Sequence, residues 1–366
     1  MVTVTAQTQR IGPCRSPSGG HGIGVIVKRT LSFRSGREAP ISISEAPSYD
    51  GDTLLAEADG WAVHKPCSDI TVSGSAFSAS PVPHLVVAVA VGAARKRIRV
   101  HGERRLRLRG GRMQFERVAP FCGERLLSYA DAYGGVLGAR SRSRRGAFGA
   151  RNNDELDPNF HIYPRNPVGR GFITRELADA ADGSLAPSQE LEDDLVDPSR
   201  LLRMSPDDWT AAPLPGHFGP IAPSWFPRVQ WLVPFSRAAL GPHLAEMSLC
   251  GLTEADCARG VNTVDARVLS SAAPGLAVPS LAGRVPVELV GFRWGNGVAR
   301  FGVDVTPPRT RLAFPGAGFY EVEQRLKTFA IDADAEEVSL VWAGFQPTAM
   351  RYRDEDTADI QVEVRS

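Results

Sequence analysis

Apolar and basic residues alternate along residues 97–101 and again along residues 105–109, and this period of two predicts β-structure. The basic positions are Arg97, Arg99, Arg105, Arg107 and Arg109. The apolar positions are Ile98, Val100, Leu106 and Leu108. His101-Gly102-Glu103 lies between the two runs and is expected to form a turn. We therefore predict a β-hairpin with one apolar face and one arginine face that points outward.

The rest of the chain favours short strands joined by many turns, because 36 glycines and 28 prolines interrupt it. A second hairpin is predicted from Val287–Trp294 and Val298–Val305 around Gly295-Asn296-Gly297. Further strands are expected at Leu85–Val91 and Glu337–Ala343. Helical signals are few, with short turns expected at Thr253–Arg259 and Asp207–Trp209. The predicted fold class is mainly β, with antiparallel β-sandwich-like sheets, long Pro/Gly-rich loops and few short helices.

The sequence pattern predicts four parts of the chain. Residues 1–20 are expected to be a flexible tail, and residues 21–230 a β-rich domain. Residues 231–285 are read as an irregular or helical connector. Residues 286–366 are expected to form a second β-rich region packed on the first.

Charge is distributed unevenly, although the formal net charge is only +1. Residues 95–151 hold sixteen Lys or Arg and four acids, whereas residues 152–200 hold four Arg and eleven acids. Like charges on one hairpin face repel, so the arginine face needs compensation. Solvent counterions, the chain's own acidic block at residues 176–197, or an acidic partner could each provide it. The run Arg140–Arg145 reads instead as a mobile basic loop.

The sequence indicates no export and no membrane span. Its first ten residues are polar, and its longest apolar run, Leu85–Ala94, is about half the length that a span needs. The five cysteines are odd in number and contain no C-x-x-C, which argues against a disulfide framework. We therefore expect a cytoplasmic protein with reduced thiols.

Motifs of known catalysis are missing from the sequence. It holds no G-x-S-x-G elbow, no P-loop and no H-E-x-x-H, and its seven histidines are scattered singly. The glycine-rich run Gly19–Gly24 precedes a predicted strand instead of following one, so it does not fit a dinucleotide site. We expect no catalytic residues, no cofactor and no metal.

Five segments in one order carry a family resemblance. They are His64–Gly74, Lys96–Arg104, Tyr129–Gly135, Asn166–Phe172 and Pro215–Arg228. Through them the chain resembles a bacterial family of unknown function that is often encoded beside type VI secretion spike proteins and their toxins. The resemblance implies an accessory or adaptor protein that loads a toxin effector onto a VgrG-type spike. It implies a secreted effector, the spike protein, or both as partners, and it brings no catalytic residues.

The motif residues are expected to be structural, holding long loops onto a β scaffold. They are Lys65, Pro66, Asp69, Gly74, Gly102, Tyr133, Gly134, Gly135, Asn166, Pro167, Gly169, Gly171, Phe218, Gly219, Pro220, Trp225 and Arg228. Lys65-Pro66 is expected to bend the chain before Asp69, whose carboxylate can accept hydrogen bonds from the following turn.

Three functions remain open at this point. The first is a non-enzymatic adaptor or chaperone whose partner docks on the arginine face. The second is a hydrolase or carbohydrate-active enzyme of unrecognised type on a β scaffold. The third, nucleic-acid binding through residues 95–145, is the least favoured, because the arginine face has no interleaved aromatic residues for base stacking.

Overall fold

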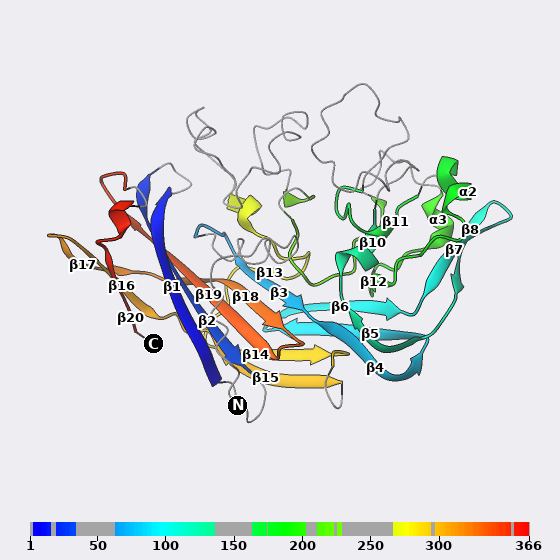
Figure 1. Cartoon of the computed structure of the whole chain (residues 1–366), viewed down its shortest axis with the longest axis horizontal. Coiled ribbons are helices and arrows are strands. Elements are labelled where there is room, and N and C mark those ends of the chain that lie inside the picture. The colour runs from blue at the N-terminus through cyan, green and yellow to red at the C-terminus, as the bar shows by residue number, and fades with distance from the viewer. Residues whose placement is uncertain are drawn as a thin grey trace, which may run out of the picture.

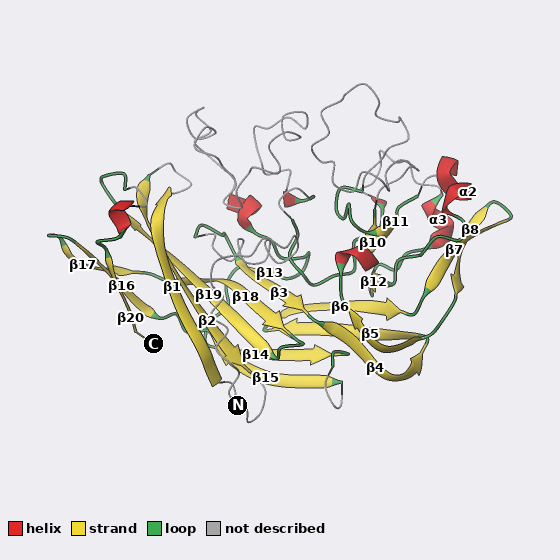
Figure 2. Ribbon diagram, viewed as in Figure 1, coloured by secondary structure: helices red, strands yellow, loops and turns green. Residues whose placement is uncertain are grey.

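The computed structural model describes ten segments of the chain. They are residues 3–15, 20–33, 63–135, 163–173, 175–202, 211–222, 225–228, 266–293, 297–352 and 355–365. Strands dominate these segments (Figure 2). The α-helices within them are α2 (Ala178–Ala181) and α3 (Pro198–Leu201), each about one turn long. The predicted fold class, mainly β with several antiparallel sheets and few short helices, is confirmed.

The largest sheet brings the two ends of the chain together (Figure 1). In spatial order its strands are β1 (Thr3–Arg15), β2 (His21–Ser32), β19 (Glu337–Pro347), β18 (Arg325–Asp332), β3 (Ser68–Ser73) and β13 (Ala277–Val278). All neighbours are antiparallel except β18 and β3, which are parallel. Strand β19 lies between β2 and β18, and its residues Leu340–Gly344 are buried on both faces of the sheet.

A second sheet has five strands, and all neighbours in it are antiparallel. In spatial order they are β12 (Gln189–Leu191), β6 (Ala94–His101), β5 (His84–Val91), β14 (Arg284–Val290) and β15 (Val298–Asp304). The strands expected at Leu85–Val91 and Glu337–Ala343 are confirmed by β5 and β19. The pairing of the second predicted hairpin is confirmed by β14 and β15, from Val290 opposite Val298, whereas residues 294–296 of its predicted tip lie outside the described residues.

The two sheets share one apolar core. Trp342 from the first sheet and Val89, Ile98 and Leu289 from the second belong to one buried cluster. Trp342 is the largest fully buried side chain among the described residues, and its Nε1 donates a hydrogen bond to the carbonyl of Val305 (3.2 Å). This shared burial, at about 25 cal/mol per Å² of apolar surface, joins the two sheets into one packed unit.

Smaller elements lie around this core. The small sheets are β17 (Gly318–Val322), β16 (Arg309–Phe314) and β20 (Gln361–Arg365); β4 (Ser75–Val82) with β9 (Phe121–Leu126); β7 (Arg104–Arg109) with β8 (Arg112–Arg117); and β10 (Tyr133–Gly134) with β11 (Arg170–Gly171). The 3-10 turns are η1 (Tyr129–Asp131), η3 (Arg175–Leu177), η6 (Ala266–Leu269) and η7 (Glu355–Thr357). In Figure 1 the β16–β17–β20 sheet and the β7–β8 hairpin lie at opposite ends of the molecule.

The predicted N-terminal tail is wrong, because Thr3–Arg15 form β1 and pair with β2 along its whole length. The predicted division of the chain does not separate the sheets either. Strand β3 pairs with β18, and β5 pairs with β14, so residues 21–230 and 286–366 share both large sheets. Residues 231–265, which include Thr253–Arg259, lie outside the described residues, as do Arg140–Arg145 and Asp207–Trp209. Residues 266–285 contain η6, β13 and the start of β14.

Candidate docking surface and buried polar clusters

The alternating stretch 96–109 does not form the predicted hairpin. Strand β6 pairs with β5 and β12, whereas β7 pairs with β8. The turns lie elsewhere: Gly92 (φ 57°) follows β5, and Gly110 and Gly111 (φ 57° and 73°) connect β7 to β8. Two successive positive φ values suit a tight hairpin turn, so Gly110-Gly111 is the sequence signal that could have located the turn. Gly102 instead allows close approach, since a Cβ there would lie 2.0 Å from the carbonyl oxygen of Ala119.

The alternation nevertheless predicts correctly which side chains turn inward. Ile98, Val100 and Leu106 are buried, Leu108 is partly buried, and the five predicted arginines are half-buried or exposed. These arginines are therefore divided between two sheets, with Arg97 and Arg99 on β6 and Arg105, Arg107 and Arg109 on β7. The prediction of a single arginine face is wrong, because the arginines belong to two sheets. The outward orientation of their side chains agrees with the prediction.

The chain's own acidic segment lies along β6. Strand β12 pairs antiparallel with β6, and the residues that follow it contact the arginines. Arg97 Nη2 lies 3.0 Å from Asp193, and Arg99 makes a two-pronged contact with Glu192 at 2.9 and 2.7 Å. The hydrogen bond to Arg99 holds the pKa of Glu192 below its usual range. The acidic block thus compensates part of the arginine charge.

A more deeply buried group of charges lies at the β6–β7 bend. Glu190 accepts from Arg104 Nη2 (2.5 Å) and lies 3.2 Å from His101 Nε2, and Arg104 also donates to the carbonyl of Pro187. Burial lowers the pKa of both His101 and Arg104. Glu190 is only 2% exposed, so this contact fastens β12 to the β6–β7 bend and is not open to a partner.

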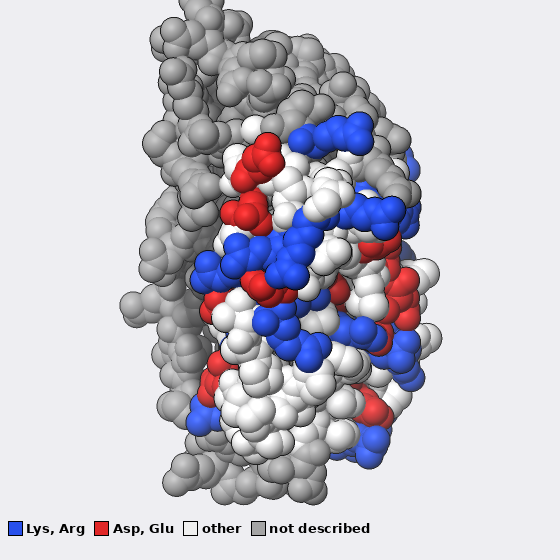
Figure 3. All heavy atoms as spheres, turned by 90° about the vertical axis from the view of Figure 1, so that its right-hand side faces the viewer, with Lys and Arg blue, Asp and Glu red and all other residues white. Residues whose placement is uncertain are grey.

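The β7–β8 hairpin carries the remaining arginines. Arg105 pairs with Glu103 (3.1 Å). Arg107 and Arg109 share Glu116, at 2.6 and 3.3 Å. Figure 3 shows basic side chains gathered on this side of the molecule, with fewer acidic ones between them.

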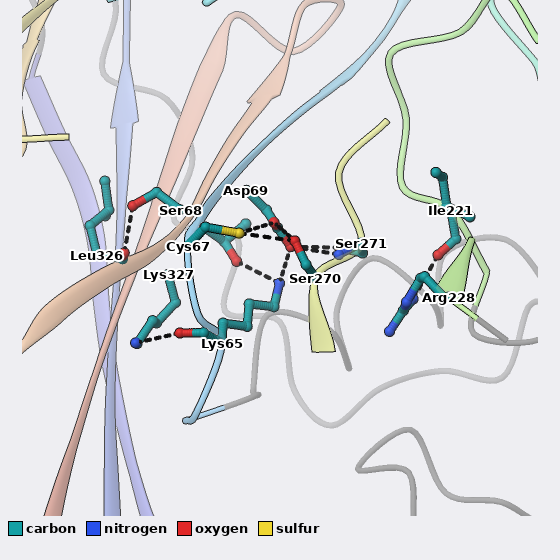
Figure 4. Close-up of polar contacts among 11 residues, drawn as sticks. Lys65, Cys67, Ser68, Asp69, Ile221, Arg228, Ser270, Ser271, Leu326 and Lys327 are labelled. Atoms are coloured by element: carbon teal, nitrogen blue, oxygen red, sulfur yellow. Dashed lines mark hydrogen bonds and ion pairs between the residues drawn. The ribbon is translucent and has the colours of Figure 1, made fainter. Parts of the chain in front are cut away.

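The family motif His64–Gly74 forms a buried polar cluster (Figure 4). Lys65 Nζ lies 2.8 Å from Asp69 Oδ2, and both side chains are 0% exposed. Ser270 Oγ (2.5 Å) and the Ser271 amide (2.7 Å) also donate to the Asp69 carboxylate, and Lys65 donates to Thr328 Oγ1 (3.2 Å). Burial alone would raise the pKa of Asp69, but Lys65 and the serines hold it below its usual value.

This cluster fastens three distant segments to one point. Lys65 and Asp69 precede or begin β3, Thr328 lies on β18, and the serines follow η6. Cys67 Sγ lies 3.1 Å from Ser270 Oγ, and burial raises the pKa of its thiol above the ordinary value. A thiol with a raised pKa is a poor nucleophile, so these contacts hold the chain together and do not activate Cys67.

The Tyr129–Gly135 and Asn166–Phe172 motifs interlock. Asn166 Nδ2 donates to the carbonyls of Tyr129 (2.8 Å) and Tyr133 (3.0 Å). Gly134 (φ 151°) packs against this asparagine, and a Cβ there would lie 2.2 Å from its carbonyl oxygen. Gly169 is similarly close-packed, since its Cβ would lie 2.6 Å from the carbonyl oxygen of Ala132. Only glycine fits these positions.

The Pro215–Arg228 motif packs against the same region. His217 Nδ1 accepts from the Gly219 amide (2.7 Å), and its ring lies 4.1 Å from that of Tyr129. Burial lowers the pKa of His217 to about 4. Trp225 meets Tyr129 edge to face, and Arg228 Nη1 donates to the carbonyl of Ile221 (2.6 Å).

The remaining motif residues are mostly covered as well. The buried ones are Gly74, Gly102, Gly135, Pro167, Phe218 and Gly219. The half-buried ones are Gly171 and Pro220, whereas Pro66 is exposed. Phe218 belongs to the main core. Most of the family-motif side chains therefore contact the chain itself.

Sequence reasoning missed several partners in these clusters. Glu190, Ser270 and Ser271 were not identified, because they lie 86, 201 and 202 residues from the groups that they contact. Lys96 was read as part of the basic pattern, yet its side chain points inward and donates to the carbonyl of Pro274 (3.1 Å). Burial lowers its pKa to about 8.

Neither a metal site nor a membrane helix is found in the part of the chain that the structure describes. No three His, Cys, Asp or Glu side chains converge there as metal ligands would. No described helix has the length and apolar character needed to cross a bilayer.

The fold and its clusters define a mainly β protein whose family motifs are loop anchors. Residues 18–343 match the family described as "uncharacterized protein conserved in bacteria (DUF2169)". The chain therefore belongs to this bacterial family. No curated protein and no solved structure matches it.

Proposed function

We propose that the chain is a non-enzymatic, cytoplasmic adaptor that binds another protein. Its resemblance to type VI secretion accessory proteins suggests a secreted effector, a VgrG-type spike protein, or both as partners. The observation that supports this proposal most is that polar side chains of the family motifs bond within the chain. The polar groups of Lys65, Asp69, Asn166 and His217 bond to the chain's own backbone and side chains.

Because these motif residues stabilise the fold, we expect exposed side chains elsewhere on the surface to recognise a partner protein. Lys65, Asp69, Asn166 and His217 are buried and each makes a hydrogen bond within the chain, as structural polar groups do. By contrast, charged side chains on the β6–β12 and β7–β8 strands remain open to solvent. Exposed complementary charge favours a role in recognising a partner.

Among the described residues, the Asp69 cluster is one group of buried polar side chains that an enzyme could use. Its carboxylate already accepts five hydrogen bonds, from Lys65, Cys67, Ser270 and two donors of Ser271. Those bonds stabilise the ionised form and occupy its lone pairs, which disfavours it as a general base. The adaptor function is therefore preferred.

Co-purification tests the proposal. The tagged chain is expressed with the spike or toxin proteins that neighbouring genes are found to encode, and is recovered at 50 and 150 mM salt. We expect at least one of them to be retained at both salt concentrations. A tagged Asp69→Asn variant, which we expect to be misfolded, serves as the negative control. Recovery of neither protein with the native chain would contradict the adaptor function.

A further inference from the structure

The outer face of the β7–β8 hairpin has a surplus of positive charge. The cross-strand register places Arg105 opposite Glu116, Arg107 opposite Gln114 and Arg109 opposite Arg112. The other face, with Leu106, Leu108, Met113 and Phe115, packs on the cluster that includes α2 and α3. The outer face is thus fixed in place by its apolar underside.

Carboxylates of the described residues do not balance this surplus. Glu116 serves both Arg107 and Arg109, and Asp182 is 3.9 Å from Arg107. Arg112 and Arg117 are exposed and have no carboxylate within ion-pair distance among the described residues. Two arginines directly opposite each other, such as Arg109 and Arg112, repel unless an anion lies between them. The hairpin tip is therefore an incomplete charge network.

The molecule itself shows which ligand such arginines accept. On neighbouring β6, the turn that follows β12 places Glu192 on Arg99 and Asp193 on Arg97. The guanidinium fork of Arg99 grips both oxygens of one carboxylate, which is the strong geometry for this pair. The arginines of β6 are thus paired with acidic side chains of the same chain, whereas Arg112 at the β7–β8 tip has no such pair among the described residues.

We propose that the β7–β8 tip, centred on Arg109 and Arg112, binds an acidic segment of a protein partner. This inference rests on the proposed adaptor function and names the chemistry of its partner. Charge complementarity commits the site to carboxylates. The outer face presents Arg, Gln and Glu side chains and no aromatic ring on which bases could stack, and this favours a peptide over nucleic acid.

A peptide-binding measurement tests this assignment. The probe is a fluorescein-labelled peptide of residues 188–195, Ser-Gln-Glu-Leu-Glu-Asp-Asp-Leu, and its control has every Glu and Asp replaced by Gln and Asn. Anisotropy is read with the full chain at 50 mM salt. The test variant is R109E/R112E. The matched control is R309E/R365E, which reverses another directly opposed arginine pair at the far end of the molecule.

We expect the acidic peptide to bind and the neutral one not to bind. R109E/R112E should weaken binding about tenfold, because two exposed ion pairs become repulsive, while R309E/R365E should leave it unchanged. Circular dichroism confirms that both variants fold. Absent binding, or equal loss in both variants, overturns the proposal. Tighter binding of an eight-nucleotide dT strand, lost in R109E/R112E, would assign the tip to nucleic acid instead.

The two proposals fail separately. If the neighbouring spike and toxin proteins do not co-purify but the acidic peptide binds at the tip, the adaptor function fails and the surface assignment stands. If they co-purify equally well with R109E/R112E, the adaptor function stands and the tip is not its docking site.

Discussion

The Lys65–Asp69 cluster and the Arg97–Asp193 contact are both ion pairs, yet they lie in opposite environments. The first is 0% exposed on both sides, whereas the second is 55% and 74% exposed. Removing one partner of a buried pair leaves an uncompensated charge away from water, but an exposed pair exchanges its partner for solvent at little cost. Buried ion pairs therefore stabilise this fold, while exposed ion pairs are free to exchange their partners.

The largest effect should follow from breaking the buried pair. Lys65→Met leaves the Asp69 carboxylate buried beside apolar carbon and should lower the free energy of unfolding by about 3–5 kcal/mol. Urea denaturation at pH 7 measures it. A loss below 1 kcal/mol would show that water reaches the cluster and that the two regions do not differ in kind.

Acid should weaken the buried region next. His217 is held neutral with a pKa of about 4, whereas an unfolded histidine titrates near 6.5. Between these values the unfolded chain binds the extra proton, so stability is complete above about pH 6.5 and falls by about 2–3 kcal/mol towards pH 4. Urea midpoints at pH 6.5 and 4.5 measure the loss. His217→Asn, which can still accept from the Gly219 amide, should flatten this dependence; an unchanged slope would contradict it.

Replacing Lys96 should have the opposite effect on stability from replacing Lys65, because Lys96 contacts the carbonyl of Pro274 and not a carboxylate. Its folded pKa of about 8 lies below the unfolded value, so the folded state gains stability as pH rises from about 8 to 10.5. Lys96→Met should raise the free energy of unfolding at pH 7 by about 1–2 kcal/mol. Thermal melts at pH 7 and 9.5 should show the gain shrinking with pH. A destabilised variant would mean that Lys96 is better compensated than Pro274 alone provides.

The smallest effect belongs to the exposed pair. Asp193→Asn removes only the carboxylate that faces Arg97 and should change the free energy of unfolding by no more than about 0.5 kcal/mol. Its melting temperature at 20 and 500 mM salt should match that of the native chain. A loss comparable to that of Lys65→Met would erase the distinction between the two regions.

Sequence reasoning located the strands and their inward faces, because alternation with period two is a local property. It identified β5, β19 and the β14–β15 hairpin. It failed for β6 and β7, since it assigned the turn to Gly102 and not to Gly92 and Gly110-Gly111. It also missed β1, because its polar sequence resembles a flexible tail. Strand β1 forms through its pairing with β2, and composition does not reveal that pairing.

The clusters were only half predictable. The motifs singled out Lys65, Asp69 and Asn166 as structural residues, and the structure places all three in buried hydrogen-bonded positions. Their partners on β18 and after η6 could not be found, because no local pattern relates residues that are two hundred positions apart.

Local side-chain chemistry alone determined that this chain would form pleated strands with arginines outward and apolar residues inward. Only the tertiary structure decided which strands became neighbours, and hence which arginines met Glu192 and Asp193 and which met solvent. The physical reason is that the charge on a guanidinium is known from its residue type, but its compensation depends on carboxylates that the folded chain brings within a few ångströms.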